Sequence, residues 1–265
     1  MFGIFKKDHK TTRYPLGIVL SGGGTRGFAH LGVLKALEEN NIKPEIISGV
    51  SAGSIVGALY ADGYKPEEIL KELTSHKLLN YLDFSIPKTG LVKMSGFEKT
   101  LKKMLRAKNF EDLKIPLKVF AVNMNTAEYT CFEKGPVAIA VKASSSIPVI
   151  FPPVEIDGEE FTDGGVINNF PVEALQDICD KIIGVSVNPL GERKNLDSLK
   201  KIAERTFQLT IRSHTLERKD KCDLFIEPEG LDDYGLLDLS SAHEIFDLGY
   251  ESALKSLEKN QWLKE

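Results

Sequence analysis

Short apolar runs alternate with longer segments of helical periodicity along most of the chain. The apolar runs show little alternation with polar residues, which is typical of strands buried on both faces. Strands are expected over Leu16–Leu20, from Ile46, and over Leu117–Val122, Lys181–Val187 and Cys222–Ile226, with hairpins involving Tyr129–Phe132 and Val154–Phe161. Because helical segments separate most of the strands, the pattern predicts an α/β fold with a mainly parallel sheet covered on both faces.

The helical segments carry boundary signals. Phe28–Glu39 places an apolar residue at every third position and so presents one apolar face. Pro66 followed by two glutamates suits a helix start. Ser95–Glu98 and Ser241–Glu244 have capping-box spacing, so a helix is expected after each, the second reaching roughly to Lys259. Further helices are expected over Val137–Ala143 and from Leu196 to about Arg218.

The segment Leu78–Pro87 mixes apolar residues with turn formers and has no clear period. Two interpretations stay open: a lid or mouth over an apolar pocket, or a loosely packed connection. If a pocket is present, its walls are expected to come from Leu78–Met104.

Composition is that of an ordinary globular protein: 265 residues, 42% hydrophobic and 27% charged, with a net charge of −4. Without a basic block, nucleic acid is not expected as a partner. No apolar stretch is long enough to span a bilayer, and no secretory signal is recognisable. Three distant cysteines lack metal-site spacing. We therefore expect a cytoplasmic protein with a flexible tail over residues 1–14 and one domain over 15–265. The apolar residues Phe2, Ile4 and Phe5 beside lysines suggest transient membrane-surface contact or simply a frayed terminus.

Candidate chemistry gathers at three glycine-marked turns. In the second, Gly49–Gly53, Ser51 stands between small residues where an apolar run passes into a helical pattern. This arrangement fits a nucleophile elbow, in which a sharp turn exposes the serine hydroxyl. Glycine and serine are also common in ordinary strand-to-helix connections, so this motif alone leaves both interpretations open.

The first turn, Gly22–Gly27, matches two motifs. It fits the dinucleotide fingerprint, but that site needs an acidic residue at the end of the second strand, and the nearest acid, Glu45, precedes this strand. The alternative is an oxyanion loop, in which glycine N–H groups at a helix start stabilise negative charge on an ester oxygen. The sequence favours the oxyanion loop. Arg26 is expected either to add positive charge beside it or to be an ordinary exposed arginine that faces solvent.

A nucleophilic serine needs a base, and two candidates remain. Asp163 lies in the third turn, Asp163–Gly165. His243 would complete the chain order Ser51, Asp163, His243 seen in α/β-hydrolases, although a surface position at a helix start is its more ordinary role. His30, on the helix after the glycine loop, is expected to be a packed or surface residue.

The three turns together resemble the patatin-like phospholipase family. The similarity runs from about Leu16 to Val172 and includes Ala143–Pro148 and Asn168–Pro171. It implies a three-layer α/β/α sandwich and a serine–aspartate dyad in place of a triad. Carried over position by position, Ser51 matches the nucleophile, Asp163 its partner, and Gly22, Gly23, Gly24 and Arg26 the oxyanion loop.

The resemblance implies hydrolysis of lipid acyl esters, as by a phospholipase A, lysophospholipase or esterase, with no metal or other cofactor. Since an unperturbed aspartate is a weak base, burial of Asp163 is expected to raise its pKa. Two other functions use the same features: transfer of the acyl group from Ser51 to an alcohol or thiol, and lipid binding without catalysis. The sequence indicates neither the lipid class nor the oligomeric state.

Overall fold

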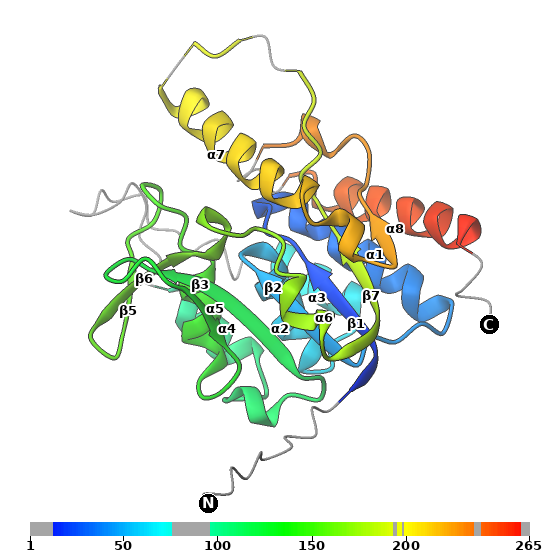
Figure 1. The fold of residues 1–265 in the computed structure, drawn as a ribbon, viewed down its shortest axis with the longest axis horizontal. Coiled ribbons are helices and arrows are strands. Elements are labelled where there is room, and N and C mark those ends of the chain that lie inside the picture. Colours follow the sequence, from blue (N-terminus) through cyan, green and yellow to red (C-terminus); the bar gives the residue numbers. More distant parts are fainter. Residues whose placement is uncertain (1–12, 76–95, 193–194, 198, 236–239, 261–265) are drawn as a thin grey trace, which may run out of the picture.

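The computed structural model describes residues 13–75, 96–192, 195–197, 199–235 and 240–260 (Figure 1). The apolar cluster near the N-terminus and the lid or mouth expected over Leu78–Pro87 lie outside the described residues. Within this part of the chain, no helix is long and apolar enough to cross a membrane.

One mixed sheet forms the centre of the molecule (Figure 1). Its order is β5-β6-β3-β2-β1-β7-β8, and β4 also pairs with β3. Strands β3, β2, β1, β7 and β8 run parallel, whereas β4 and β6 are antiparallel to β3, and β5 is antiparallel to β6. The bounds are β1 Tyr14–Leu20, β2 Ile46–Val50, β3 Leu117–Asn123, β4 Tyr129–Phe132, β5 Val154–Ile156, β6 Glu159–Asp163, β7 Cys179–Val185 and β8 Leu224–Ile226.

Helices flank this sheet, as the sequence predicts. The α-helices are α1 Phe28–Glu39, α2 Ala52–Ala61, α3 Pro66–Thr74, α4 Phe97–Met104, α5 Val137–Ser144, α6 Glu173–Gln176, α7 Leu199–Leu216 and α8 Ala242–Lys259. Short 3-10 helices are η1 Gly24–Gly27, η2 Phe110–Asp112, η3 Gly164–Val166, η4 Lys219–Lys221 and η5 Leu231–Asp233. The helix expected over Phe28–Glu39 is α1 itself. The helix after Ser241 also begins where expected, but the Ser241 side chain makes no capping hydrogen bond.

The two faces of the sheet are covered unequally. Alternate residues of β1 point to opposite sides: Ile18 and Leu20 enter the large core with α1, α2 and α8, while Val19 enters a smaller cluster with Phe170 and Leu175. On the larger side, α1 and α8 cross closely. A Cβ on Gly32 would lie 2.0 Å from the Phe246 carbonyl oxygen, so this contact requires glycine. The crossing fixes α1, which begins directly after the glycine loop.

Candidate active site

Strand register brings Ser51 and Asp163 to the same level of the sheet. Val50, the last residue of β2, is paired with Phe120 of β3, so Ser51 follows at the level of Ala121. On the same edge of β3, beyond the end of β2, Ala121 is paired with Asp163, the last residue of β6, while β4 occupies the opposite edge. The two residues therefore lie next to each other at one edge of β3, although they are far apart in sequence.

Ser51 has the backbone conformation of a sharp strand-to-helix turn. Its φ of 51° and ψ of −125° are unusual for a residue with a side chain. The crowding explains the neighbouring glycines: a Cβ on Gly49 would lie 2.7 Å from the Gly53 carbonyl oxygen, and one on Gly53 2.2 Å from that of Leu20. This geometry fits a nucleophile elbow, with the first-turn amides of α2 beside the serine.

Asp163 is a buried carboxyl group beside this serine. The residue is 1% exposed, its Oδ1 accepts a hydrogen bond of 2.8 Å from the Gly165 N–H, and its buried Oδ2 has no hydrogen bond of ordinary geometry within the described part of the chain. Burial raises the pKa of Asp163 to about 7, while hydrogen bonding to the Ser51 side chain and to the Gly165 N–H acts to lower it. Its pKa therefore suits proton transfer near neutral pH.

A run of serines at the end of α5 connects the backbones of these two residues. The Ser144 hydroxyl oxygen accepts a hydrogen bond of 2.9 Å from the Ser51 N–H. Two residues later, the Ser146 carbonyl oxygen accepts one of 2.9 Å from the Asp163 N–H. Sequence reasoning missed this role, although three consecutive hydroxyl residues at a predicted helix end were a usable signal. The end of α5 thus holds both turns in position.

The glycine loop after β1 lies against Ser51. A Cβ on Gly22 would be 2.9 Å from the Ser51 Cβ and 2.4 Å from Asn169 Oδ1, so no larger residue fits without a shift. Within the described residues, the N–H groups of Gly22, Gly23 and Gly24 donate no hydrogen bond. These three amides are therefore available to a ligand beside the serine.

Arg26 is buried, although an arginine beside the site was expected to act through its charge. The residue is 1% exposed, and its guanidinium donates to the Tyr234 carbonyl oxygen from Nε at 3.0 Å and from Nη2 at 2.9 Å. Its backbone N–H donates to the Gly23 carbonyl oxygen at 3.2 Å. Arg26 thus ties the glycine loop to the segment before α8.

Two of the five histidines bear on the choice of base. His30 is fully buried on α1, and its Nε2 lies 2.8 Å from the Ser21 carbonyl oxygen. Burial lowers the pKa of His30 to about 4, so it is neutral at pH 7 and donates to that carbonyl. His243 is exposed on the first turn of α8, and among the described residues it makes no hydrogen bond to Ser51 or Asp163.

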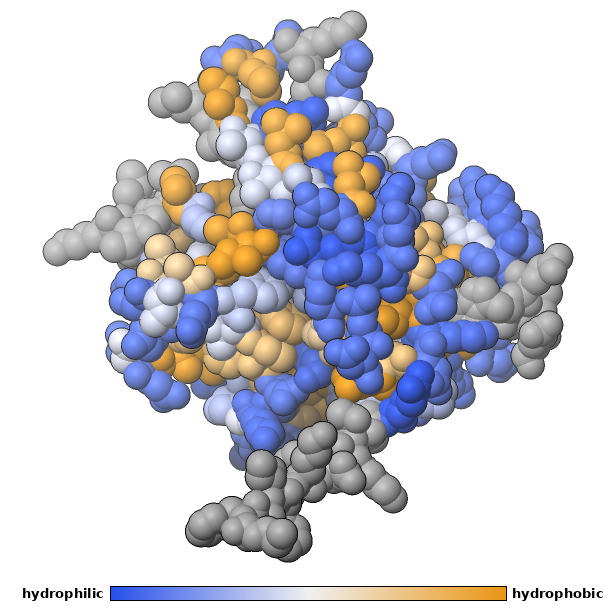
Figure 2. Space-filling view, viewed as in Figure 1, coloured by the Kyte–Doolittle hydropathy of each residue, from blue (hydrophilic) through white to orange (hydrophobic). Residues whose placement is uncertain are grey.

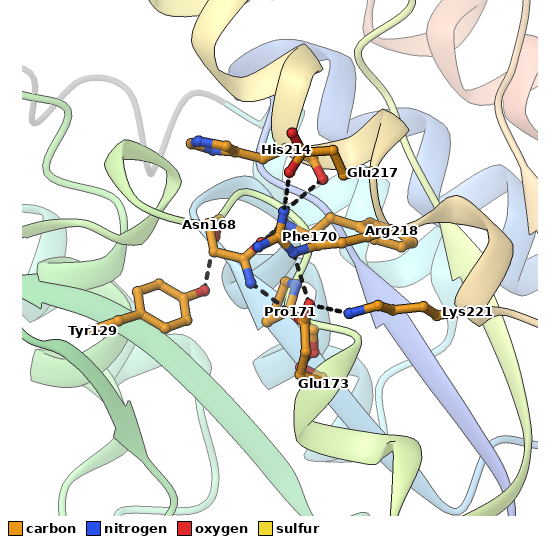
Figure 3. Close-up of polar contacts among 10 residues, drawn as sticks. Tyr129, Asn168, Phe170, Pro171, Glu173, His214, Glu217, Arg218 and Lys221 are labelled. Carbon is orange, nitrogen blue, oxygen red and sulfur yellow. Dashed lines mark hydrogen bonds and ion pairs between the residues drawn. The ribbon is translucent and has the colours of Figure 1, made fainter.

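A polar cluster holds the segment after Asp163 in place (Figure 3). Glu173 is its centre: Oε1 binds Arg218 at 2.8 Å and Lys221 at 2.7 Å. The other Glu173 oxygen accepts from Asn168 Nδ2 at 3.2 Å, and the Tyr129 hydroxyl donates to the Asn168 carbonyl oxygen at 2.8 Å. The cluster joins this segment to β4 and to the end of α7, neither of which the sequence linked to the site. No group of three or more metal-binding side chains is placed to hold an ion in the described ranges.

Comparisons with known proteins show which sequences and folds this chain resembles. A family model described as patatin-like phospholipase matches residues 18–175, which include the three glycine-marked turns. An uncharacterised NTE family protein of Mycobacterium tuberculosis is 32% identical over 176 residues, covering 65% of this chain and 49% of that protein.

Longer relatives match more of this chain. Lysophospholipase NTE1 of Debaryomyces hansenii is 27% identical over 268 residues, which cover 88% of this chain and 17% of that protein. The chain thus spans half or less of the curated relatives it matches. Among solved structures, VipD from Legionella pneumophila has a similar fold, with a TM-score of 0.54 at 15% identity, covering 94% of this chain and 67% of that one.

Proposed function

Because the chain belongs to the patatin-like phospholipase family, we propose that it is a serine hydrolase of lipid acyl esters that uses Ser51 and Asp163. One observation carries the proposal: a buried carboxyl with a pKa near 7 lies beside a serine on a strained turn, next to three uncommitted glycine amides. Base, nucleophile and oxyanion donors are thus together in one place. Neither a metal nor another cofactor has a part in this mechanism.

The first half of the reaction forms an acyl-serine. Asp163 takes the hydroxyl proton as Ser51 Oγ attacks the ester carbonyl carbon, and the N–H groups of Gly22, Gly23 and Gly24 stabilise the oxyanion. The ester C–O bond then breaks, and Asp163 returns the proton to the departing alcohol. In the second half, Asp163 takes a proton from water as the water attacks the acyl carbon. When the tetrahedral intermediate collapses, the carboxylic acid leaves and the proton returns to Ser51.

Arg26 has an anchoring part in this scheme. Its guanidinium donates to the Tyr234 carbonyl oxygen, and its backbone N–H donates to the Gly23 carbonyl oxygen within the loop. Both interactions stabilise the shape of the loop. We assign the oxyanion contacts to the three glycines and the placement of the loop to Arg26.

Labelling with a fluorophosphonate probe tests the nucleophile directly, since the probe reacts with activated serines. Wild-type protein should be labelled and should release fatty acid from lipid esters, whereas Ser51→Ala should do neither while remaining folded. Ester hydrolysis that persists in Ser51→Ala would contradict the proposal. Asp163→Asn should lose nearly all activity and His243→Ala almost none; loss of activity in both variants would indicate a triad with His243 as base.

The two alternative functions differ in testable ways. Acyl transfer would share the acyl-serine, so adding an alcohol or thiol acceptor would divert product from free acid to a new ester or thioester. A pure lipid-binding module has no use for the strain at Ser51 or the buried carboxyl of Asp163, both of which reduce stability. Hydrolysis is therefore favoured over binding alone.

Contact with a membrane surface would bring the substrate to the enzyme, and the outer face of α7 is suited to it. Among the side chains of α7 that the structure describes, the exposed ones carry no charge. They are Ile202, Thr206, Leu209, Thr210, Ser213 and Leu216. Thr206 and Thr210 turn their hydroxyls back onto the carbonyl oxygens of residues 202 and 206. Figure 2 shows apolar surface over α7, which also packs against η3, directly after Asp163. We propose that this face of α7 lies on the membrane surface, at the boundary between the lipid head groups and the acyl chains.

Flotation with phosphatidylcholine vesicles tests this contact. The variant Ile202→Asp/Leu209→Asp should bind vesicles at least tenfold more weakly and hydrolyse vesicle lipid more slowly, yet cleave a short-chain, monomeric ester at the wild-type rate. The control Asp247→Asn, at an exposed position of α8, should leave all three measurements unchanged. Unaltered vesicle binding by the α7 variant would refute a role for this face.

A further inference from the structure

The carbonyl oxygen of Gly22 accepts hydrogen bonds from three side chains. Asn188 Nδ2 donates at 2.5 Å, Asn169 Nδ2 at 3.2 Å and the Ser21 hydroxyl at 3.1 Å. A carbonyl oxygen has two lone pairs, so three donors restrict this peptide group strongly. The shortest of the three bonds comes from Asn188, which follows β7 and lies beyond residues 18–175, the part matched by the family model.

The restraint on this carbonyl also fixes the next amide. The peptide between Gly22 and Gly23 is planar and trans, so the Gly23 N–H points away from the Gly22 oxygen. Donors gathered on the carbonyl therefore set the direction of the N–H on the opposite side. They also polarise the peptide, which makes the N–H a stronger donor.

The Asn188 side chain is held at an energetic cost. The residue is 1% exposed, and its Oδ1 is buried with no hydrogen-bond partner in the described part of the chain. If the amide were turned over, Oδ1 would face the Gly22 carbonyl oxygen, and two acceptors cannot form a hydrogen bond. Nδ2 must therefore be the atom that faces this oxygen. A buried, half-satisfied amide reduces stability, which is a common feature of groups kept for a functional reason.

The surrounding contacts make Asn188 part of a rigid support for the glycine loop. The Val187 N–H donates to the Ser21 hydroxyl oxygen at 3.0 Å. The Ser21 carbonyl oxygen in turn accepts a hydrogen bond of 2.8 Å from His30 Nε2. A Cβ on Gly23 would lie 3.3 Å from Asn188 Oδ1, so the amide also lies against the second glycine.

We infer that Asn188 is a positioning residue of the oxyanion hole, which holds the Gly22 carbonyl so that the Gly23 N–H is directed at the oxyanion that forms on the substrate carbonyl oxygen when Ser51 attacks. The inference rests on the proposed hydrolase function. Asn188 itself does not contact the reacting atoms; it acts through one peptide group.

Two substitutions with different effects on packing test the inference. Asn188→Leu keeps the branched shape of the side chain, at a somewhat larger volume, but removes the donor, and Asn188→Ala removes both the branch and the donor. Each should lower kcat for a monomeric ester roughly 10-fold to 100-fold, somewhat less than the loss of a direct oxyanion donor, while KM changes less than about twofold. The rate of fluorophosphonate labelling should fall in parallel. Ser186→Ala is the matched control, because Ser186 is equally buried two residues earlier but bonds to Glu227 instead of the loop.

The readout distinguishes positioning from mere stabilisation. If Asn188 were only structural, the variants would contain fewer active molecules, but kcat per labelled serine would match the wild type, and that result would overturn the inference. If neither Asn188 variant folds, Asn169→Ala is the substitute test, because it removes another donor from the Gly22 carbonyl oxygen. Its kcat should fall by less than is expected for the Asn188 variants, and an unchanged kcat would overturn the inference. If wild-type protein neither reacts with the probe nor cleaves esters, the proposed hydrolase function itself is wrong.

Discussion

Replacing Asp163 by asparagine should stabilise the protein at neutral pH while removing the proposed base. An ordinary aspartate has a pKa of 3.8, and burial raises that of Asp163 to about 7 in the folded protein. Between these values the folded state binds a proton that the unfolded state has lost. The free energy of unfolding therefore decreases as pH rises from about 4 to 7.

The size of this effect follows from the difference between the two pKa values. At about 1.4 kcal/mol per pKa unit, ionisable Asp163 reduces stability by about 4 kcal/mol at pH 7 and above, as an upper estimate. The asparagine introduced by Asp163→Asn would not titrate, and its amide oxygen can still accept the Gly165 N–H. The variant should match the wild type near pH 4 and exceed it by up to about 4 kcal/mol at pH 8.

Urea unfolding followed by circular dichroism, at pH 4, 6 and 8, measures this difference. Other titrating groups cancel when the variant is compared with the wild type at each pH. Asp62→Asn is the matched control: Asp62 is also buried, but its two oxygens accept the N–H groups of Arg106 and Ala107, so an amide NH₂ there would face a donor and destabilise the fold. A stability difference for Asp163→Asn that is zero, negative or independent of pH would refute the reasoning.

Two further predictions concern the glycine loop and its support. Gly22→Ala should abolish activity and slow fluorophosphonate labelling at least 100-fold, because its Cβ would lie 2.9 Å from the Ser51 Cβ; near-normal labelling would show that the loop is not at the reacting serine. Burial lowers the pKa of His30 from 6.5 to about 4, so between these pH values the unfolded state binds a proton that the folded state does not. The free energy of unfolding of the wild type should therefore fall by about 3 kcal/mol from pH 6.5 to 4, relative to that of His30→Gln. Urea unfolding at several pH values tests this, and parallel curves would contradict it.

The sequence by itself determined the class of fold and most of its elements. Apolar runs without alternation indicated buried parallel strands, and helical patterns together with capping-box spacing placed α1, α5, α7 and α8 to within a few residues. These features are local: they depend on spacing that any segment shows on its own. The glycine-marked turns were visible for the same reason, because a strained or crowded backbone requires small residues wherever it occurs.

Only the tertiary structure decided what lies beside each turn. The equal level of Ser51 and Asp163 depends on the pairing of both strands with β3, and the pKa of Asp163 depends on burial by residues from elsewhere in the chain. The burial of Arg26 and the contact of Asn188 with Gly22 likewise join segments far apart in sequence. Such contacts leave no periodic signal, because they arise from the packing of separate elements. The sequence thus identified the candidate reacting groups, and the fold determined which residues hold them.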